Sequence, residues 1–154
     1  YYIEYSDNLS SWSLLVSYQG QSNIDTTYTI NDSFSMAAQR FYRCRKGNDN
    51  STGNIIGFVI KDLPVGQTMI ANPLGTDDNI IFNALPELSD GTVLYKWNAG
   101  NQQYEINSFD FDEWDDPNIS FSPGEGAIVD STVAQTIVFM GEPWRSFSTS
   151  ITDG

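Results

Sequence analysis

The chain has 154 residues, of which 40% are hydrophobic and 14% aromatic, so it can hold one ordinary domain or two small ones around a real core. This composition excludes intrinsic disorder. The formal net charge of −13 comes from 20 acidic and 7 basic residues. A surface of this sign repels phosphate groups, so we expect neither nucleic acid nor an anionic membrane surface as a partner.

Histidine is absent from the sequence. The chain therefore lacks the most common general base and the most common transition-metal ligand, which argues against catalytic triads, zinc sites and haem sites. No apolar run approaches the ~20 residues that a helix needs to cross a bilayer, so we expect no membrane insertion. The sequence begins in strand-like residues without an initiator Met, and we expect a processed or excised piece of a longer precursor.

Residues 1–47 show the period-2 alternation of short β-strands. In the first predicted strand, over 1–6, one face carries Tyr1, Ile3 and Tyr5. Further strands are predicted over 12–17, 27–30 and 40–45. In the last of these, Cys44 is expected to be a small buried core residue rather than a nucleophile.

Residues 48–54 form the clearest linker in the sequence, because they contain no apolar side chain. Beyond it, strands are predicted over 55–61, 67–71, 92–97, 104–106, 126–130, 136–140 and 144–151. One short helix is expected near 78–85, with Thr76 as its N-cap and Pro86 at its end. Short strands separated by turn residues predict an all-β, β-sandwich-like fold made of one or two small β-modules.

Two segments resemble known β-modules. Residues 1–47 resemble part of the fibronectin-type-III-like or immunoglobulin-like modules found near the ends of secreted bacterial proteins. The residues that carry this resemblance are Tyr2, Ile3, Glu4, Tyr5, Ser6, Asp7, Leu9, Trp12 and Leu15, then Arg40, Phe41, Tyr42 and Arg43, with Cys44 where such modules usually have Val.

The second segment, residues 55–142 of an acidic β-rich part that runs to 154, resembles a poorly characterised β-module that often follows the first kind. The matching pieces are Met69 to Leu74, Asp90 to Thr92, Tyr95 to Trp97, Trp114 with Asp115, and Pro123 to Gly126. The resemblance implies a secreted or cell-surface setting and no particular activity. A complete sandwich needs about seven strands, so the roughly four strands of 1–47 must pack on 55–142 or be completed by another copy.

A carboxylate cluster lies in a predicted loop over 109–126. Its members are Asp110, Asp112, Glu113, Asp115 and Asp116. Oxygen ligands in a flexible loop suit Ca²⁺ better than a softer metal, and a solvated acidic loop without metal is the alternative; no other cofactor is expected. Paired carboxylates also serve glycosidases, but adjacent loop acids do not place two groups across a cleft, so no enzyme activity is expected.

The FDFD segment that opens this loop is predicted to be strand-like. Asp110 and Asp112 are expected on one side of it, and Phe109 and Phe111 on the other.

Three aromatic residues lie on or near the loops of the second part and suggest a flat platform for sugar rings. They are Trp97, Tyr104 and Trp114. The alternative interpretation is core or cross-strand packing, which is the usual role of such side chains.

The basic residues of the first part are concentrated in one predicted strand. They are Arg40, Arg43, Arg45 and Lys46, and they balance the four acids of residues 1–47, whereas 48–154 carries sixteen acids and three bases. The four residues form either the solvent face of a strand or a basic patch that docks on an acidic surface. A basic patch at one end of an acidic protein favours head-to-tail association of copies.

The first and last predicted strands, 1–6 and 144–151, are expected to have uncovered edges, one of which pairs with another chain. The side chains that would enter a neighbour are Tyr1, Ile3 and Tyr5, or Trp144, Phe147 and Ile151. The sequence thus predicts a non-enzymatic extracellular or cell-surface structural protein, a subunit of a fibre or surface layer that assembles with its own copies through β-strand pairing. The alternative is a carbohydrate-binding or adhesive accessory module of a larger secreted protein, with glycans as partners.

Overall fold

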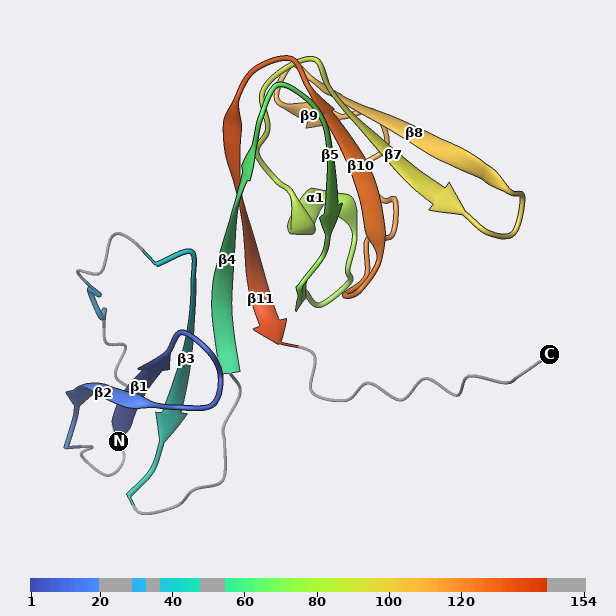
Figure 1. The fold of residues 1–154 in the computed structure, drawn as a ribbon. Helices are drawn as coiled ribbons and strands as arrows, with labels where there is room; N and C mark the ends of the chain where they lie inside the picture. The colour runs from blue at the N-terminus through green and yellow to red at the C-terminus, as the bar shows by residue number, and fades with distance from the viewer. Residues whose placement is uncertain (20–28, 33–36, 48–54, 144–154) are drawn as a thin grey trace.

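The fold is all-β and sandwich-like, and the described residues form two antiparallel sheets and one short helix (Figure 1). A computed structural model describes residues 1–19, 29–32, 37–47 and 55–143. The strand order is β2-β1-β3-β4-β11-β6 in the first sheet and β5-β10-β7-β8-β9 in the second. This architecture confirms the predicted fold class.

The first sheet contains strands from both sides of the predicted linker. Its members are β1 (Tyr2–Ser6), β2 (Ser13–Ser17), β3 (Gln39–Arg45), β4 (Ile55–Leu63), β6 (Leu74–Gly75) and β11 (Gln135–Pro143). β3 pairs with β1 on one side and with β4 on the other. The backbone ladder therefore continues from residues 1–47 into the second part of the chain.

The second sheet begins directly after β4, where a turn ending at Gly66, with φ 91°, leads the chain into β5. Its members are β5 (Gly66–Ala71), β7 (Thr92–Asn98), β8 (Gln103–Asp110), β9 (Glu113–Trp114) and β10 (Gly126–Ser131). The β7–β8 hairpin extends away from the rest of the molecule (Figure 1).

The core lies between the second sheet and the β4–β11 pair. The first sheet contributes Leu63, Ile137 and Phe139, the second contributes Leu94, Phe109 and Val129, and the connecting segments contribute Ile81, Leu85 and Phe121. All nine are at most 3% exposed. Burial alternates along β7 and β10, which accounts for the period-2 pattern of apolar residues in these parts of the sequence.

The helix α1 (Ile81–Ala84) is one turn long and lies within the predicted range 78–85. Its N-cap is Ile80, which makes no side-chain capping bond. The prediction that Thr76 caps the helix is therefore wrong. The Thr76 hydroxyl instead accepts a hydrogen bond from the Asn79 amide at 3.1 Å, closing a separate turn that ends before the helix begins.

Two other predictions require correction. Cys44 is exposed rather than buried. Phe41 marks the face of β3 that packs on the core, whereas Cys44 lies on the other face, where it pairs with Ile3 of β1. Of the strand predicted over 27–30, only 29–30 are described, and they are not in a strand. The strand predicted over 144–151 lies outside the described residues.

Gly57 permits the close approach of β4 to β3. A Cβ at this position would collide with the Phe41 ring and lie 2.6 Å from the carbonyl oxygen of Arg40. Since the carbonyl belongs to the β3 backbone, Gly57→Ala should lower the free energy of unfolding by about 1–3 kcal/mol. Thermal unfolding measures the effect. Gly126→Ala is the matched control, because its added Cβ would make an ordinary 3.6 Å contact with the Ile70 carbonyl oxygen. Equal losses of stability in both variants would contradict this account.

Candidate functional site

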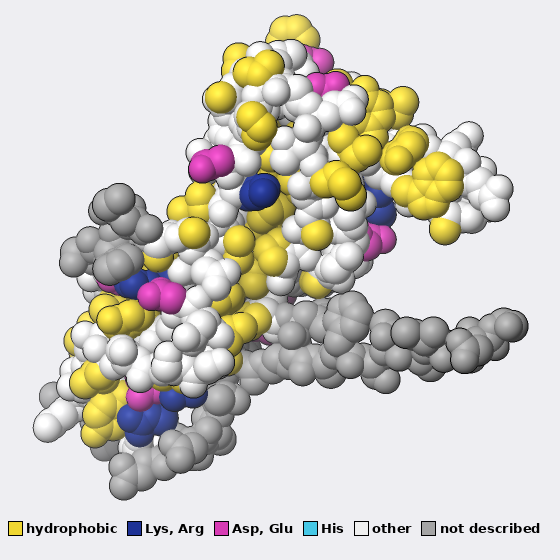
Figure 2. Space-filling model, in the orientation of Figure 1, with side chains coloured by type: hydrophobic (Ala, Val, Ile, Leu, Met, Phe, Trp, Pro, Cys, Tyr) yellow, Lys and Arg dark blue, Asp and Glu magenta, His cyan; other side chains and the backbone are white. Residues whose placement is uncertain are grey.

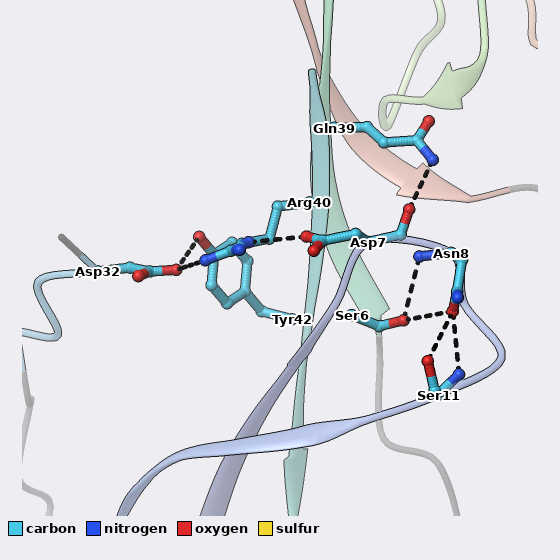
Figure 3. A network of polar contacts seen from close by, with 8 residues as sticks. All are labelled: Ser6, Asp7, Asn8, Ser11, Asp32, Gln39, Arg40 and Tyr42. Atoms are coloured by element: carbon cyan, nitrogen blue, oxygen red, sulfur yellow. Dashed lines mark hydrogen bonds and ion pairs between the residues drawn. The ribbon is translucent and has the colours of Figure 1, made fainter. Parts of the chain in front are cut away.

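Arg40, the first member of the predicted basic patch, is buried in an ion-pair network (Figure 3). Its side chain is 2% exposed. Nε donates to Asp7 Oδ1 at 2.9 Å and Nη1 donates to Asp32 Oδ2 at 2.7 Å. The guanidinium also lies 4.3 Å from the centre of the Tyr5 ring. Burial alone would lower the pKa of Arg40, but the two carboxylates outweigh it and raise that pKa, so the charge is permanent.

Arg43 and Arg45 share one carboxylate, that of Glu4. Arg43 Nε donates to Glu4 Oε2 at 2.7 Å, and Arg45 Nη2 donates to Oε1 at 3.0 Å. The Arg43 guanidinium lies over the Trp12 ring and that of Arg45 over the Tyr2 ring, at 4.2 and 4.6 Å from their centres. Both arginines therefore stabilise the contact of β3 with its neighbours.

The predicted basic patch is thus not a free cationic surface. The carboxylates that neutralise its arginines come from β1, from the turn after it and from residues 29–32. Only Lys46 of the four is exposed. The sequence shows the arginines side by side in one strand, but the acids that pair with them are far away along the chain.

The predicted acidic loop begins as a tight hairpin. Phe111 and Asp112 form its two-residue turn, with φ of 56° and 62°, and Asp110 pairs with Glu113. The predicted alternation of FDFD along one strand is therefore wrong, because the chain reverses at Phe111. Phe111 is 91% exposed at the tip of this hairpin.

The five carboxylates of this segment do not converge. Asp110 Oδ1 accepts from the Gly91 amide at 2.9 Å, and Asp116 Oδ1 accepts from the Asn118 amide at 3.0 Å. Within the described ranges, no three His, Cys, Asp or Glu side chains gather in a way that could hold a metal ion. The geometry does not provide the calcium cluster that the sequence suggested.

Trp114 does not belong to an exposed aromatic platform, contrary to the prediction. Its side chain is 5% exposed, its Nε1 donates to the Leu85 carbonyl oxygen at 2.9 Å, and its ring packs edge-to-face on Phe109. Trp97 and Tyr104 are 51% and 49% exposed and lie opposite each other on β7 and β8. Their ring centres are 5.2 Å apart, in an edge-to-face arrangement.

Beside Trp97 lies a polar hollow of about 780 Å³, here called the fork. It opens where β7 separates from β10, because the β7–β10 ladder ends at Lys96 while the β7–β8 hairpin continues. The segment 116–125 forms its other wall. The polar side chains that line it are Lys96, Asn98, Glu105, Asp116, Ser120 and Glu125. Sequence reasoning missed the fork because these residues come from three separate segments.

The cation of the fork is already paired. Lys96 Nζ lies 3.2 Å from Glu125 Oε2 and donates to the Ser120 carbonyl oxygen at 2.5 Å. On the other wall, Asn98 Nδ2 donates to Glu105 Oε1 at 2.5 Å. Carboxylates therefore exceed ammonium groups in this hollow.

The outer face of the second sheet carries a row of apolar side chains, here called the apolar row. The register of the strands places one residue from each of β5, β10, β7 and β8 side by side, namely Met69, Ile128, Tyr95 and Ile106. Met69 is 79% and Ile106 63% exposed. Figure 2 shows hydrophobic side chains exposed over the β7–β8 part of the molecule. Outer faces of sandwiches are usually polar, so the exposed apolar side chains of this row depart from the usual pattern.

The strand edges differ from the prediction. β1 is paired on both sides, with β2 and with β3, so Tyr1, Ile3 and Tyr5 do not form an open edge. The other predicted edge residues, Trp144, Phe147 and Ile151, lie outside the described residues. Within the part of the chain that is described, β5 pairs only with β10, and β2 only with β1.

No protein-family model, no curated protein and no solved structure matches this chain. The resemblance to fibronectin-type-III-like modules therefore stays a prediction. The described residues include no helix of the length and apolarity that a bilayer crossing requires.

The Glu4 pairs predict a dependence of stability on pH. Hydrogen bonding from Arg45, and then from Arg43, lowers the pKa of Glu4 below its ordinary value of 4.5, although burial opposes this. A folded-state pKa below the unfolded one stabilises the fold fully above pH 4.5, and this stabilisation is lost as the pH falls through the lowered value.

Glu4→Gln should therefore be less stable than the wild type at neutral pH, by about 1–2 kcal/mol. The difference should shrink on acidification below pH 4.5. Urea unfolding at a series of pH values measures it, with Glu87→Gln, an exposed carboxylate without an ion pair among the described residues, as control. A constant difference at every pH would show that Glu4 does not act through its charge.

Proposed function

We propose that this protein is a non-enzymatic extracellular or cell-surface structural module that assembles with its own copies by β-strand pairing. The observation that carries the proposal is the outer edge of β5, which pairs with no other strand among the described residues. Its six residues, GQTMIA, contain neither a charge nor a proline. Natural sheets usually protect an edge of this length with charged residues, proline or a bulge, because unpaired N–H and C=O groups pair readily with another chain.

The apolar row supports the same joint. Met69 of β5 lies at one end of the row, at the edge where a neighbouring strand would add. A strand that pairs with β5 would place its own side chains beside Met69 and cover part of this exposed surface. Backbone pairing would supply affinity, and the apolar row would supply register and specificity.

A second strand edge, that of β2, is also unpaired within the described ranges, and two such edges support polymers rather than closed dimers. β2, with the sequence SLLVS, also lacks charge and proline, and it lies at the other end of the molecule from the second sheet (Figure 1). A contact between unlike edges of successive copies is heterologous and generates a filament when the rotation between copies does not close a ring. This is the geometry that a fibre or surface layer requires.

Charge would control the strength of assembly. Copies with a net charge of −13 repel one another. Salt at 0.15 M shortens the range of this repulsion to roughly 8 Å, while strand pairing and apolar contact act at shorter distances. Assembly should therefore strengthen as the ionic strength rises, which is the opposite of a joint held by ion pairs.

Met69→Lys tests the proposed edge. A lysine on β5 introduces a charge of the kind that protects natural edges, and it should weaken association by tenfold or more, which corresponds to about 1.4 kcal/mol. Val133→Lys, at another exposed apolar position in the turn between β10 and β11, is the matched control and should associate like the wild type. Sedimentation velocity over a wide range of protein and salt concentrations measures the association.

Amide hydrogen exchange identifies the strand through which the copies associate. The amides of β5 should become more protected as the concentration rises, whereas packing through the apolar row alone would leave them unchanged. Monomers of wild type at every protein and salt concentration would overturn the proposal, as would equal association of the Met69→Lys and wild-type proteins.

A further inference from the structure

We propose that the outer edge of β11 binds residues 144–151 of a second copy as an added strand. β4 pairs with one side of β11 over 135–141, whereas β6 pairs with the other side only at Glu142 and Pro143. Among the described residues, no strand, turn or loop makes a backbone hydrogen bond to this other side of residues 136–140. The inference rests on the proposed assembly by strand pairing, and it names a joint that is separate from the β5 edge.

A hollow of about 310 Å³ lies along this part of β11. Leu85, Pro86 and Glu87 line one side of it, and residues 136–138 and 140 line the other. Leu85 is 1% exposed and belongs to the core, whereas Met140 is 61% exposed on the outer face of the sheet. Because the side chains of a strand alternate between its two faces, an added strand would place one set in the hollow and the other beside Met140.

A strand edge beside an apolar hollow is the arrangement that β-augmentation uses. Backbone pairing with β11 would supply affinity, and the hollow would select the side chains of the added strand. The occupant that fits is therefore an extended segment with apolar side chains at every second position.

The residues that follow β11 in the sequence have this pattern. From 146 to 151, serines alternate with the larger side chains of Phe147, Thr149 and Ile151. This period of two gives a strand one face that fits an apolar hollow and one face that fits solvent. Phenylalanine and β-branched residues are also among those that favour strands.

Charge favours this segment over the rest of the chain. Residues 144–151 contain one cation, Arg145, and no carboxylate, although the whole chain has a net charge of −13. The charged side chain that lines the hollow is that of Glu87. An acidic strand would be repelled there, whereas a strand that carries Arg145 would be attracted.

The position of β6 favours pairing with a second copy. A strand that returned along β11 in a tight hairpin would have to pair first with Glu142 and Pro143, and β6 occupies these positions. Only three residues separate Pro143 from Phe147, which leaves little chain for a detour around β6. Eight extended residues span roughly 26–29 Å, which is enough to reach a neighbour and cover 136–140. Because each copy has both a donor segment and an acceptor edge, the joint is heterologous.

A synthetic peptide of residues 144–154 tests the acceptor edge on the whole 154-residue chain. The protein carries Met69→Lys, so that association through β5 does not interfere, and fluorescence anisotropy of the labelled peptide measures binding. Val138→Lys places a charge on β11 beside the hollow and should weaken binding by tenfold or more, which corresponds to about 1.4 kcal/mol. In the peptide, Phe147→Ser should have an effect of the same size.

Each change has a matched control. Ile60 lies directly opposite Val138 on β4 and is 36% exposed, against 40% for Val138. Ile60→Lys therefore adds the same charge to the same face, one strand further from the edge, and should bind the peptide like the parent protein. In the peptide, Ser148→Ala changes the opposite face of the strand and should leave binding unchanged. Melting curves identify a variant that fails to fold, and Met140→Lys, at a more exposed position, then replaces Val138→Lys.

A mixture of two variants tests the joint between whole chains. In the Met69→Lys background, copies with Phe147→Ser keep the acceptor edge, and copies with Val138→Lys keep the donor segment. Each variant should remain monomeric alone, and the mixture should form one-to-one pairs in sedimentation velocity.

Three results would overturn the inference. The first is the absence of peptide binding to the parent protein. The second is equal weakening by Val138→Lys and Ile60→Lys, which would place the contact on the outer face of the sheet instead of its edge. The third is a mixture that forms no pairs. Since these measurements use Met69→Lys, they give the same answer whether or not copies associate through β5, so the two proposals can fail separately.

Discussion

The pairing of β3 with β4 is the contact on which the N-terminal strands depend. Among the described part of residues 1–47, only one hydrophobic side chain, that of Phe41, is buried in the core, and it lies on β3 opposite Gly57 of β4. The remaining buried side chains there include Glu4, Ser6 and Arg40, which are polar. These strands could not bury enough apolar surface by themselves, so they extend a sheet whose core is built by the second part.

Ion pairs and ring contacts replace a second apolar core in this region. Each of the three arginines of β3 is held between a carboxylate and an aromatic ring. Such an arrangement is directional, because a guanidinium plane must fit both partners, and it fixes the register of β1 against β3. A buried ion pair is weak evidence for stability by itself, because the cost of desolvating the charges offsets much of their attraction.

Period-2 patterns made most of the strands and the fold class predictable from the sequence. The errors come from long-range pairing and from one unusual turn. Phe111 occupies a left-handed position where Asn or Gly is typical, so no residue signalled the β8–β9 hairpin that turns Trp114 into the core. The paired arginines and the fork depend on residues distant along the chain. Position near predicted loops suggested Trp97, Tyr104 and Trp114 as an exposed platform, and Trp114 is buried. Residue type alone does not distinguish Trp97 from Trp114. Trp97 is exposed on β7, whereas Trp114 is buried on β9.

The ladder between β3 and β4 has a mechanical consequence. It runs through five residue pairs, from Gln39 opposite Val59 to Arg43 opposite Ile55, and it joins the N-terminal strands to the strand that continues into the second sheet (Figure 1). Tension between those two ends of the molecule acts along the strands and loads the hydrogen bonds of this ladder in shear. Bonds loaded in shear must break together, whereas peeling breaks them one at a time. The molecule should therefore resist stretching along this direction far better than it resists separation of its hairpins.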